Sequence, residues 1–409
     1  MTNEVVNVPE LRFTGFEDEW KETNLGNIAN IVGGGTPKTE IPEYWNGEIN
    51  WYSPVEIGDR NYVYESKNKI TQLGLQKSSA KILPIGTVLF TARAGIGNTA
   101  ILKKEGATNQ GFQSIIPKEG VLDTYFIFSR TNELKRYGEI HGAGSTFVEI
   151  SGKEMAKMPI SIPVIKEQQK IGEFFSKLDR QIELEEQKLS LLEEQKKGYM
   201  QKIFSQELRF KDENGNDYPE WEEINLGSLY KKGKAGGTPK STESKYYNGK
   251  VPFLSISDIT KQGKFLNITE KKITQEGLDN STAWLVPVNS INYAMYASVG
   301  YLSINKIEVA TSQAIFNMVF EDYNLVEYLY YYLNYIRDKG VLEKLMGTGT
   351  QSNLSASIMK NITVKLPSKN EIIKTSKFLG NVDELIETQS SKVELLKERK
   401  EGLLQKMFV

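Results

Sequence analysis

Apolar residues recur at alternating steps of four and three in two stretches of the chain, residues 164–206 and 367–409. This spacing is the seam of a heptad repeat, so each stretch is predicted to form a long helix that pairs in a coiled coil. The first seam is Ile171, Phe175, Leu178, Ile182, Leu189, Leu192, Tyr199 and Ile203. The second seam is Leu379, Val382, Ile386, Val393, Leu396, Leu403 and Met407.

The two stretches are copies of one template. A constant offset of 204 residues aligns Phe174 with Phe378 and Asp179 with Asp383. Polar residues interrupt both seams at equivalent places, a pattern that costs stability but can fix helix register and the choice of partner. These residues are Glu185 and Lys196 in the first seam and Gln389 and Lys400 in the second. A generic helical hairpin with solvated charges is the alternative interpretation of each helix alone.

The segments between these helices are also duplicated. Gly33-Gly-Gly-Thr-Pro-Lys38 returns as Ala235-Gly-Gly-Thr-Pro-Lys240, and Tyr44-Trp-Asn-Gly47 returns as Tyr246-Tyr-Asn-Gly249. Short strand-like runs such as 49–52, 87–91 and 111–116 are punctuated by glycine and proline, and helical patterns follow at about 123–137 and 325–339. Pro163 and Pro367 mark the start of the long helices.

The predicted fold class is α+β, with pseudo-twofold organisation. Two similar globular domains, each a mixed and partly barrel-like sheet plus helices, are separated by two long helices that form an antiparallel coiled coil. The predicted boundaries are residues 1–163 for the first domain, 164–206 for the first helix, 207–366 for the second domain and 367–409 for the second helix.

The amino-acid composition excludes several kinds of catalytic and metal site. The chain of 409 residues has no cysteine and one histidine, His141, which excludes thiol chemistry and most histidine-based metal sites and catalytic triads. No apolar run is long enough to span a bilayer and the start lacks a secretory signal pattern, so we expect a cytoplasmic protein. A net charge of −1 gives no overall attraction to nucleic acid. If DNA is the ligand, positive charge must be gathered on one face or supplied by a partner.

Catalytic motifs are not evident. The sequence has no Walker-type phosphate loop, no strand–GxGxxG–helix unit and no HExxH, and Gly95-Ile-Gly97 is only a fragment of a glycine-rich turn. It also has no signature of an S-adenosylmethionine pocket. We therefore predict no active site and no metal site in this chain.

Candidate binding residues cluster in the duplicated loops. Glycine backbone N–H groups, a threonine hydroxyl and a lysine could hold a phosphate, although a tight turn explains the same loops. Aromatics mixed with hydroxyls and amides could contact bases or sugars, or be half-buried strand residues, and Arg93 could read a guanine or clamp a phosphate. The candidates in the first half are Gly34, Gly35, Thr36, Lys38, Tyr44, Trp45, Trp51, Ser53, Arg93, Gly95, Gln110 and Thr146. Those in the second half are Gly236, Gly237, Thr238, Lys240, Tyr246, Tyr247, Ser255, Tyr296, Gln313, Thr350 and Gln351.

Three motifs together resemble the specificity subunit of Type I restriction-modification enzymes. They are the Leu-Arg-Phe…Trp…Leu-Gly opening of each half, the Gly-Gly-Thr-Pro loop, and Pro163-Val-Ile-Lys-Glu-Gln-Gln-Lys-Ile171 followed by Leu178-Asp179. The resemblance covers essentially the whole chain. The second helix departs from the pattern, since it keeps Pro367 and Glu371 but lacks the Gln-Gln pair.

This resemblance implies a non-catalytic subunit with two target-recognition domains, each of which reads half of a bipartite site in double-stranded DNA. The helices would set the spacing and dock two methyltransferase subunits that bring S-adenosylmethionine, and motor-nuclease subunits would add ATP and magnesium. No cofactor is expected in this chain. Two other classes remain open: a stand-alone enzyme such as a nuclease, and a structural adaptor that joins two protein-binding domains.

Overall fold

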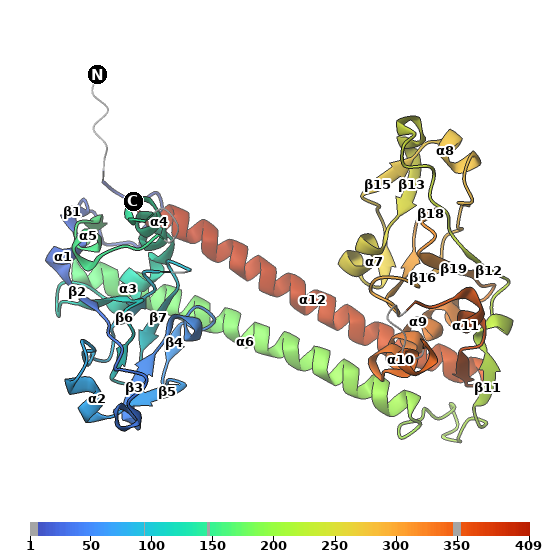
Figure 1. The fold of residues 1–409 in the computed structure, drawn as a ribbon, viewed down its shortest axis with the longest axis horizontal. Coiled ribbons are helices and arrows are strands. Elements are labelled where there is room, and N and C mark those ends of the chain that lie inside the picture. The colour runs from blue at the N-terminus through green and yellow to red at the C-terminus, as the bar shows by residue number, and fades with distance from the viewer. Residues whose placement is uncertain (1–6, 94, 145–147, 347–352) are drawn as a thin grey trace. The chain divides into compact units, whose positions relative to one another are not determined.

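The computed structural model describes residues 7–93, 95–144, 148–346 and 353–409 (Figure 1). The chain divides into two compact units. The first unit combines the chain up to Glu186 with residues 391–409, and the second unit spans residues 187–390. Each unit therefore contains a globular domain together with one part of each long helix.

The described residues of the first domain form ten strands in three sheets. The sheet orders are β2-β9-β6-β7-β4, β5-β3-β8 and β1-β10. The strands are β1 (Lys21–Asn24), β2 (Ala29–Gly33), β3 (Trp45–Tyr52), β4 (Tyr62–Val63), β5 (Asn68–Ile70), β6 (Val88–Phe90), β7 (Thr99–Leu102), β8 (Gly106–Thr108), β9 (Gln113–Pro117) and β10 (Pro159–Ile162). The helices are α1 (Leu25–Ile28), α2 (Gln72–Gln76), α3 (Thr124–Ser129), α4 (Thr131–His141) and α5 (Gly152–Met155), with 3₁₀ turns η1 (Pro42–Tyr44) and η2 (Pro54–Glu56).

The second domain repeats this arrangement strand for strand. Its sheet orders are β12-β19-β16-β17-β14, β15-β13-β18 and β11-β20. The strands are β11 (Glu222–Asn225), β12 (Lys232–Ala235), β13 (Tyr247–Leu254), β14 (Phe265–Leu266), β15 (Lys271–Ile273), β16 (Ile291–Ala294), β17 (Leu302–Asn305), β18 (Ala310–Thr311), β19 (Ile315–Val319) and β20 (Thr363–Leu366). The helices are α7 (Ile256–Gln262), α8 (Gln275–Asp279), α9 (Tyr323–Asp338), α10 (Val341–Met346) and α11 (Ala356–Lys360), with 3₁₀ turns η3 (Leu226–Ser228) and η4 (Ser244–Tyr246).

The predicted duplication and α+β class are confirmed by these matching sheet orders. The mixed, partly barrel-like sheet of the prediction consists of three separate sheets in each domain, and within the described residues none of them closes into a barrel. Short strands separated by tight turns satisfy their backbone groups in several small sheets.

The long helices are α6 (Ile165–Phe204) and α12 (Lys369–Met407). Within each unit they run antiparallel: in the first unit Asp179 of α6 pairs with Lys400 of α12, whereas Glu185, further along α6, pairs with the earlier Lys392. The members of the predicted seam are buried or half-buried apart from Tyr199, whose ring contacts Phe378 edge-on.

Each unit has a main core that joins its domain to both long helices. In the first unit Phe175 of α6 and Phe408, just after α12, pack with Phe126 of α3. In the second unit Phe204 of α6 and Leu379 of α12 belong to the same core as the tyrosines of α9. The helices are therefore part of the folded units and not separate rods.

Candidate nucleic-acid interface

The Gly-Gly-Thr-Pro-Lys loops are closely packed turns. The Gly35 N–H donates to the Thr108 carbonyl at 2.8 Å, and the Gly237 N–H donates to the Thr311 carbonyl at 2.9 Å. A Cβ atom at Gly34 would lie 1.9 Å from the Asn109 carbonyl oxygen, so only glycine fits there. The N–H groups of Gly35 and Gly237 are thus satisfied internally, and the turn interpretation holds for these glycines.

The same loops bring the next predicted residues together. The Thr36 hydroxyl donates to Oε1 of Gln110, and the Thr238 hydroxyl donates to Oε1 of Gln313. Both pairs connect the loop to the segment that follows β8 or β18. The glutamine side chains are exposed, so their amide N–H₂ groups remain able to donate to an external acceptor.

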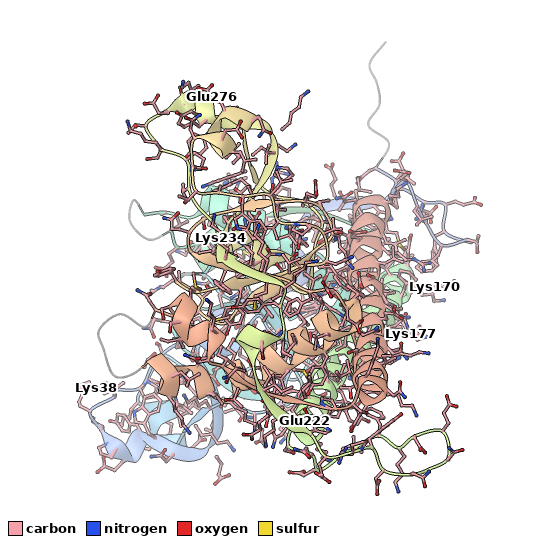
Figure 2. All side chains as sticks on the ribbon, turned by 90° about the vertical axis from the view of Figure 1, so that its right-hand side faces the viewer. Lys38, Lys170, Lys177, Glu222, Lys234 and Glu276 are labelled. Atoms are coloured by element: carbon pink, nitrogen blue, oxygen red, sulfur yellow. The ribbon has the colours of Figure 1, made fainter. Side chains whose placement is uncertain are left out.

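Two predicted lysines stand beside these pairs. Lys38 is exposed, and its side chain is labelled in Figure 2. Lys240 is exposed as well and lies 3.5 Å from Glu243. A weak surface pair of this kind is easily exchanged for a phosphate contact.

Three of the predicted aromatic side chains donate hydrogen bonds to carbonyls of the loops. The Trp51 side chain is 6% exposed, and its Nε1–H donates to the Gly35 carbonyl at 2.9 Å. The Nε1–H of Trp45 donates to the Lys38 carbonyl at 3.2 Å, and in the second domain the Tyr247 hydroxyl donates to the Pro239 carbonyl at 2.6 Å. These side chains fit the alternative interpretation: Trp51 is buried, Trp45 and Tyr247 are half-buried, and all three hold the loop in shape.

Tyr44 and Tyr246 are also half-buried. Their carbonyls accept from the N–H groups of Thr71 and Thr274, so both residues are integrated into the domain by their backbone. They are framework positions in this structure.

A second loop approaches the first one in each domain. The Ala92 N–H donates to the Gly111 carbonyl at 2.7 Å, which places Arg93 and Gly95 next to the segment that carries Gln110. Arg93 is 44% exposed and forms an ion pair with Glu149 at 2.9 Å. Gly95 has a φ of +88°, a left-handed conformation that favours glycine.

The equivalent loop of the second domain carries different chemistry. The Met295 N–H donates to the Ala314 carbonyl at 2.9 Å, in the same position relative to Gln313. The next residue is Tyr296, with 40% of its side chain exposed. The two domains thus present an arginine and a tyrosine from matching loops. The remaining predicted residues, Thr146, Thr350 and Gln351, lie outside the described residues.

Motif residues that we did not assign to a role form buried ion pairs. Arg12, from the Leu-Arg-Phe motif, contacts Glu167 in the first turn of α6 through two hydrogen bonds of 2.7 and 2.8 Å. Arg209 contacts Glu371 of α12 in the same way. The hydrogen bond to Glu167 raises the pKa of Arg12, with burial acting against it. The duplicated motifs therefore fasten the start of each half to the long helix that closes it.

A second repeated device joins three elements in each unit. The Tyr125 hydroxyl of α3 donates to Asp179 of α6 at 2.6 Å, and Lys400 of α12 contacts the other oxygen of that carboxylate at 2.6 Å. In the second unit Tyr331, Asp383 and Lys196 repeat the arrangement at 2.5 and 2.6 Å. We call these groups the Tyr–Asp–Lys triads. The lysines are two of the polar residues that interrupt the seams.

Within the described residues no group of three or more His, Asp or Glu side chains is arranged to hold a metal ion. The described helices are also too short or too polar to cross a membrane.

Comparison with known proteins identifies the domain type. The family model for the Type I restriction modification DNA specificity domain matches twice, over residues 17–194 and 218–397. The MjaIX specificity subunit of Methanocaldococcus jannaschii is 28% identical over 96% of both chains. The EcoR124I/EcoR124II specificity subunit of Escherichia coli is 34% identical over 41% of this chain and 43% of its own.

Solved structures share the fold. The S subunit of a Type I restriction-modification system from M. genitalium matches with a TM-score of 0.60 and 16% identity over 98% of this chain and 99% of its own. A chain from a study of complex assembly and conformational transition of the type I R-M system gives 0.59 and 18% over 97% and 99%.

Proposed function

This chain belongs to the Type I restriction modification DNA specificity family, with two copies of the family's domain, and we propose that each copy reads one half of a split, asymmetric DNA site. The chain is the DNA-recognition subunit of a Type I restriction-modification system and not itself an enzyme. Its task is to select the sequence on which other subunits act.

One observation carries the half-site proposal. The two domains have the same sheet order and the same Thr–Gln contacts, yet they display different side chains from matching loops, Arg93 in one and Tyr296 in the other. A guanidinium can donate twice to a guanine edge, whereas a tyrosine offers one hydroxyl and an apolar ring. A shared scaffold with different exposed chemistry is what two different half-sites require.

The long helices support a role in spacing and assembly. Each is built into the core of a domain, so a change in helix length acts directly on domain position. We propose that they set the distance between the half-sites and dock two methyltransferase subunits, with motor-nuclease subunits joining for cleavage. In this proposal S-adenosylmethionine belongs to the methyltransferase subunits, and ATP and magnesium to the motor-nuclease subunits.

Partners also account for the charge of the chain. With a net charge of −1, the chain lacks the overall positive charge on which non-specific phosphate binding depends. We propose that partner subunits supply much of that charge and that the complex acts on DNA in the cytoplasm. The isolated chain is then expected to bind DNA weakly.

The test is to reconstitute the chain with its modification subunits and map methylated adenines on genomic DNA. We expect methylation at one bipartite motif, and the Arg93→Ala variant should relax one half of that motif by about 1–3 kcal/mol and leave the other half intact. Equal weakening on all sequences would make Arg93 a phosphate contact. Methylation without sequence preference contradicts the proposal, and DNA cleavage by the chain alone with magnesium would indicate a nuclease. Protein partners retained without any effect on DNA would indicate an adaptor.

A further inference from the structure

The turn that follows strand β3 in the first domain is built like the turn that follows β13 in the second. We call residues 53–56 and 255–258 the strand-end turns. In the first domain the backbone N–H and the hydroxyl of Ser53 both donate to Oε1 of Glu56, at 2.9 and 2.8 Å, and Lys67 N–H donates to Oε2 at 2.6 Å.

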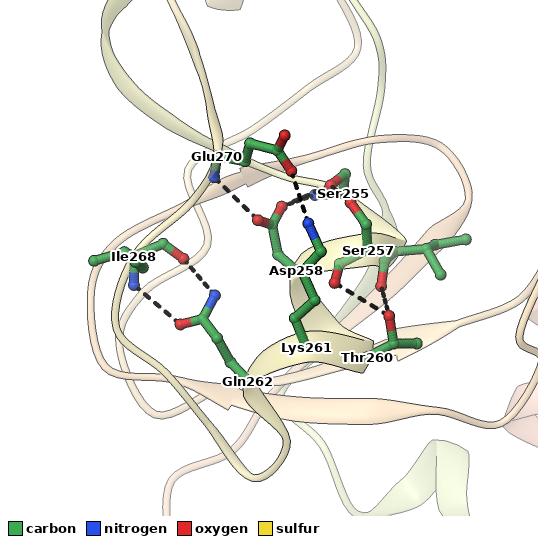
Figure 3. Close-up of polar contacts among 9 residues, drawn as sticks. Ser255, Ser257, Asp258, Thr260, Lys261, Gln262, Ile268 and Glu270 are labelled. Carbon is green, nitrogen blue, oxygen red and sulfur yellow. Dashed lines mark hydrogen bonds and ion pairs between the residues drawn. The ribbon is translucent and has the colours of Figure 1, made fainter. Parts of the chain in front are cut away.

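The second domain reaches the same arrangement with a shorter acid. The N–H and hydroxyl of Ser255 donate to Oδ2 of Asp258 at 2.9 and 2.6 Å, and Glu270 N–H donates to Oδ1 at 3.0 Å (Figure 3). In both domains one carboxylate therefore holds the turn and the next segment of chain together. A turn held at two points presents its outward side chain in a fixed direction.

Both strand-end turns lie beside the candidate interface. The Asn109 N–H donates to the Tyr52 carbonyl at 3.0 Å, which connects the end of β3 to the segment that carries Gln110. Pro54 lies so near this segment that a Cβ atom on Gly111 would come within 3.0 Å of its Cγ. In the second domain Ser312 N–H makes the matching bond to the Leu254 carbonyl at 3.4 Å.

The outward residue of the turn differs between the domains. Val55 is 90% exposed, more than any other large hydrophobic side chain among the described residues. Its equivalent, Ser257, is also exposed, and its hydroxyl shares a hydrogen bond of 2.8 Å with that of Ser255. Valine is stiff about χ1, so it presents two methyl groups to solvent in a defined position.

We propose, on the basis of the half-site function above, that residues 55 and 257 are equivalent base-reading positions and that Val55 packs against the C5-methyl group of a thymine. The thymine methyl is the apolar group that a base pair presents in the major groove. Packing against such a group removes apolar surface of Val55 from water, which favours binding. Ser257 offers a hydroxyl that can donate to or accept from a base edge, so the two turns select different bases from one scaffold.

The experiment uses the reconstituted complex and duplexes in which each thymine of the half-site read by the first domain is replaced in turn by deoxyuridine. Deoxyuridine keeps the base pair and removes only the methyl group. With the wild-type chain, one replacement should lower the rate of methylation about fourfold, the factor that corresponds to ~0.8 kcal/mol for one buried methyl group. With Val55→Ala and Val55→Ser the same replacement should have little effect.

Ser257→Ala is the matched control, because it alters the equivalent position of the other domain and must leave this thymine dependence unchanged. Because Val55 is exposed, its variants should melt at the wild-type temperature, and the second half-site should be read as before. A half-site without thymine, or a thymine dependence that persists in Val55→Ala, overturns this inference while sequence-specific methylation stands. Loss of all sequence preference in the wild-type complex overturns the half-site proposal as well.

Discussion

At the scale of single residues, burial decides which candidates could meet DNA. Trp51 and Trp45 are residue types that often contact bases, but their indole N–H groups already donate to the carbonyls of Gly35 and Lys38. Gln110, Lys38 and Val55 are exposed. Gln110 contacts the loop that carries Lys38, and the neighbouring Asn109 is hydrogen-bonded to the end of β3, which precedes Val55. An exposed side chain on a fixed backbone is the better candidate because it binds without first breaking an internal contact.

A residue-scale prediction concerns Tyr52, which is fully buried at the end of β3. Burial raises its pKa from 10.0 to about 12. Because the folded-state pKa is the higher one, stability is fully present below pH 10 and is lost as the pH rises from 10 to 12. Relative to Tyr52→Phe, the wild-type chain should lose about 2 kcal/mol of unfolding free energy by pH 12. Urea unfolding of both proteins at pH 8 and at pH 10–12 measures this difference, and equal losses would contradict it.

At the scale of elements, polar residues fix the register of the two long helices, which the apolar seam alone does not fully specify. Each Tyr–Asp–Lys triad takes its tyrosine from a domain helix, its aspartate from one long helix and its lysine from the other. A heptad seam tolerates a shift by whole heptads, but a buried carboxylate has a partner in one register only. The triads therefore specify both helix register and the orientation of the domain on its helices.

We expect Asp179→Asn to destabilise the first unit by about 3 kcal/mol, because the partly buried charge of Lys400 would lose its carboxylate partner. In a double-mutant cycle with Lys400→Met the two effects should be strongly non-additive. Thermal or urea unfolding monitored in the full chain provides the energies. Lys177→Met is the matched control, since its ion pair with Glu173 is exposed on α6 and should contribute little. Additive effects of the Asp179 and Lys400 changes would exclude the coupling.

At the scale of the whole molecule, the two long helices are copies of one template, so both can be lengthened equally. Such a change alters the length of the helices and leaves the two domains unaltered. One heptad added to α6 after Glu186 and one added to α12 after Ser390 would keep both seams and both triads in register. Seven residues lengthen a helix by about 10.5 Å, which matches roughly three base pairs at 3.4 Å each.

If the helices set the spacing, the methylated motif of this variant should keep both half-sites and gain about three base pairs between them. Methylome mapping in cells that express the complex would read this directly. A four-residue insertion in α6 near Glu185 is the contrasting variant, because it unwinds the coiled coil locally and should change the allowed spacer by a different amount. An unchanged spacer in the heptad variant would exclude the ruler role.

The sequence by itself determined the duplication, the two long helices and their seam, because heptad spacing and repeated motifs are local patterns that survive in the linear chain. It also named Thr36 and Gln110 as candidates, but only the structure shows that the two side chains are in contact. Only the tertiary structure decided that the glycines are packed turns, that Arg12 holds Glu167, and that Val55 stands exposed. Burial and hydrogen-bond partners arise from segments far apart in sequence, and residue type does not reveal them.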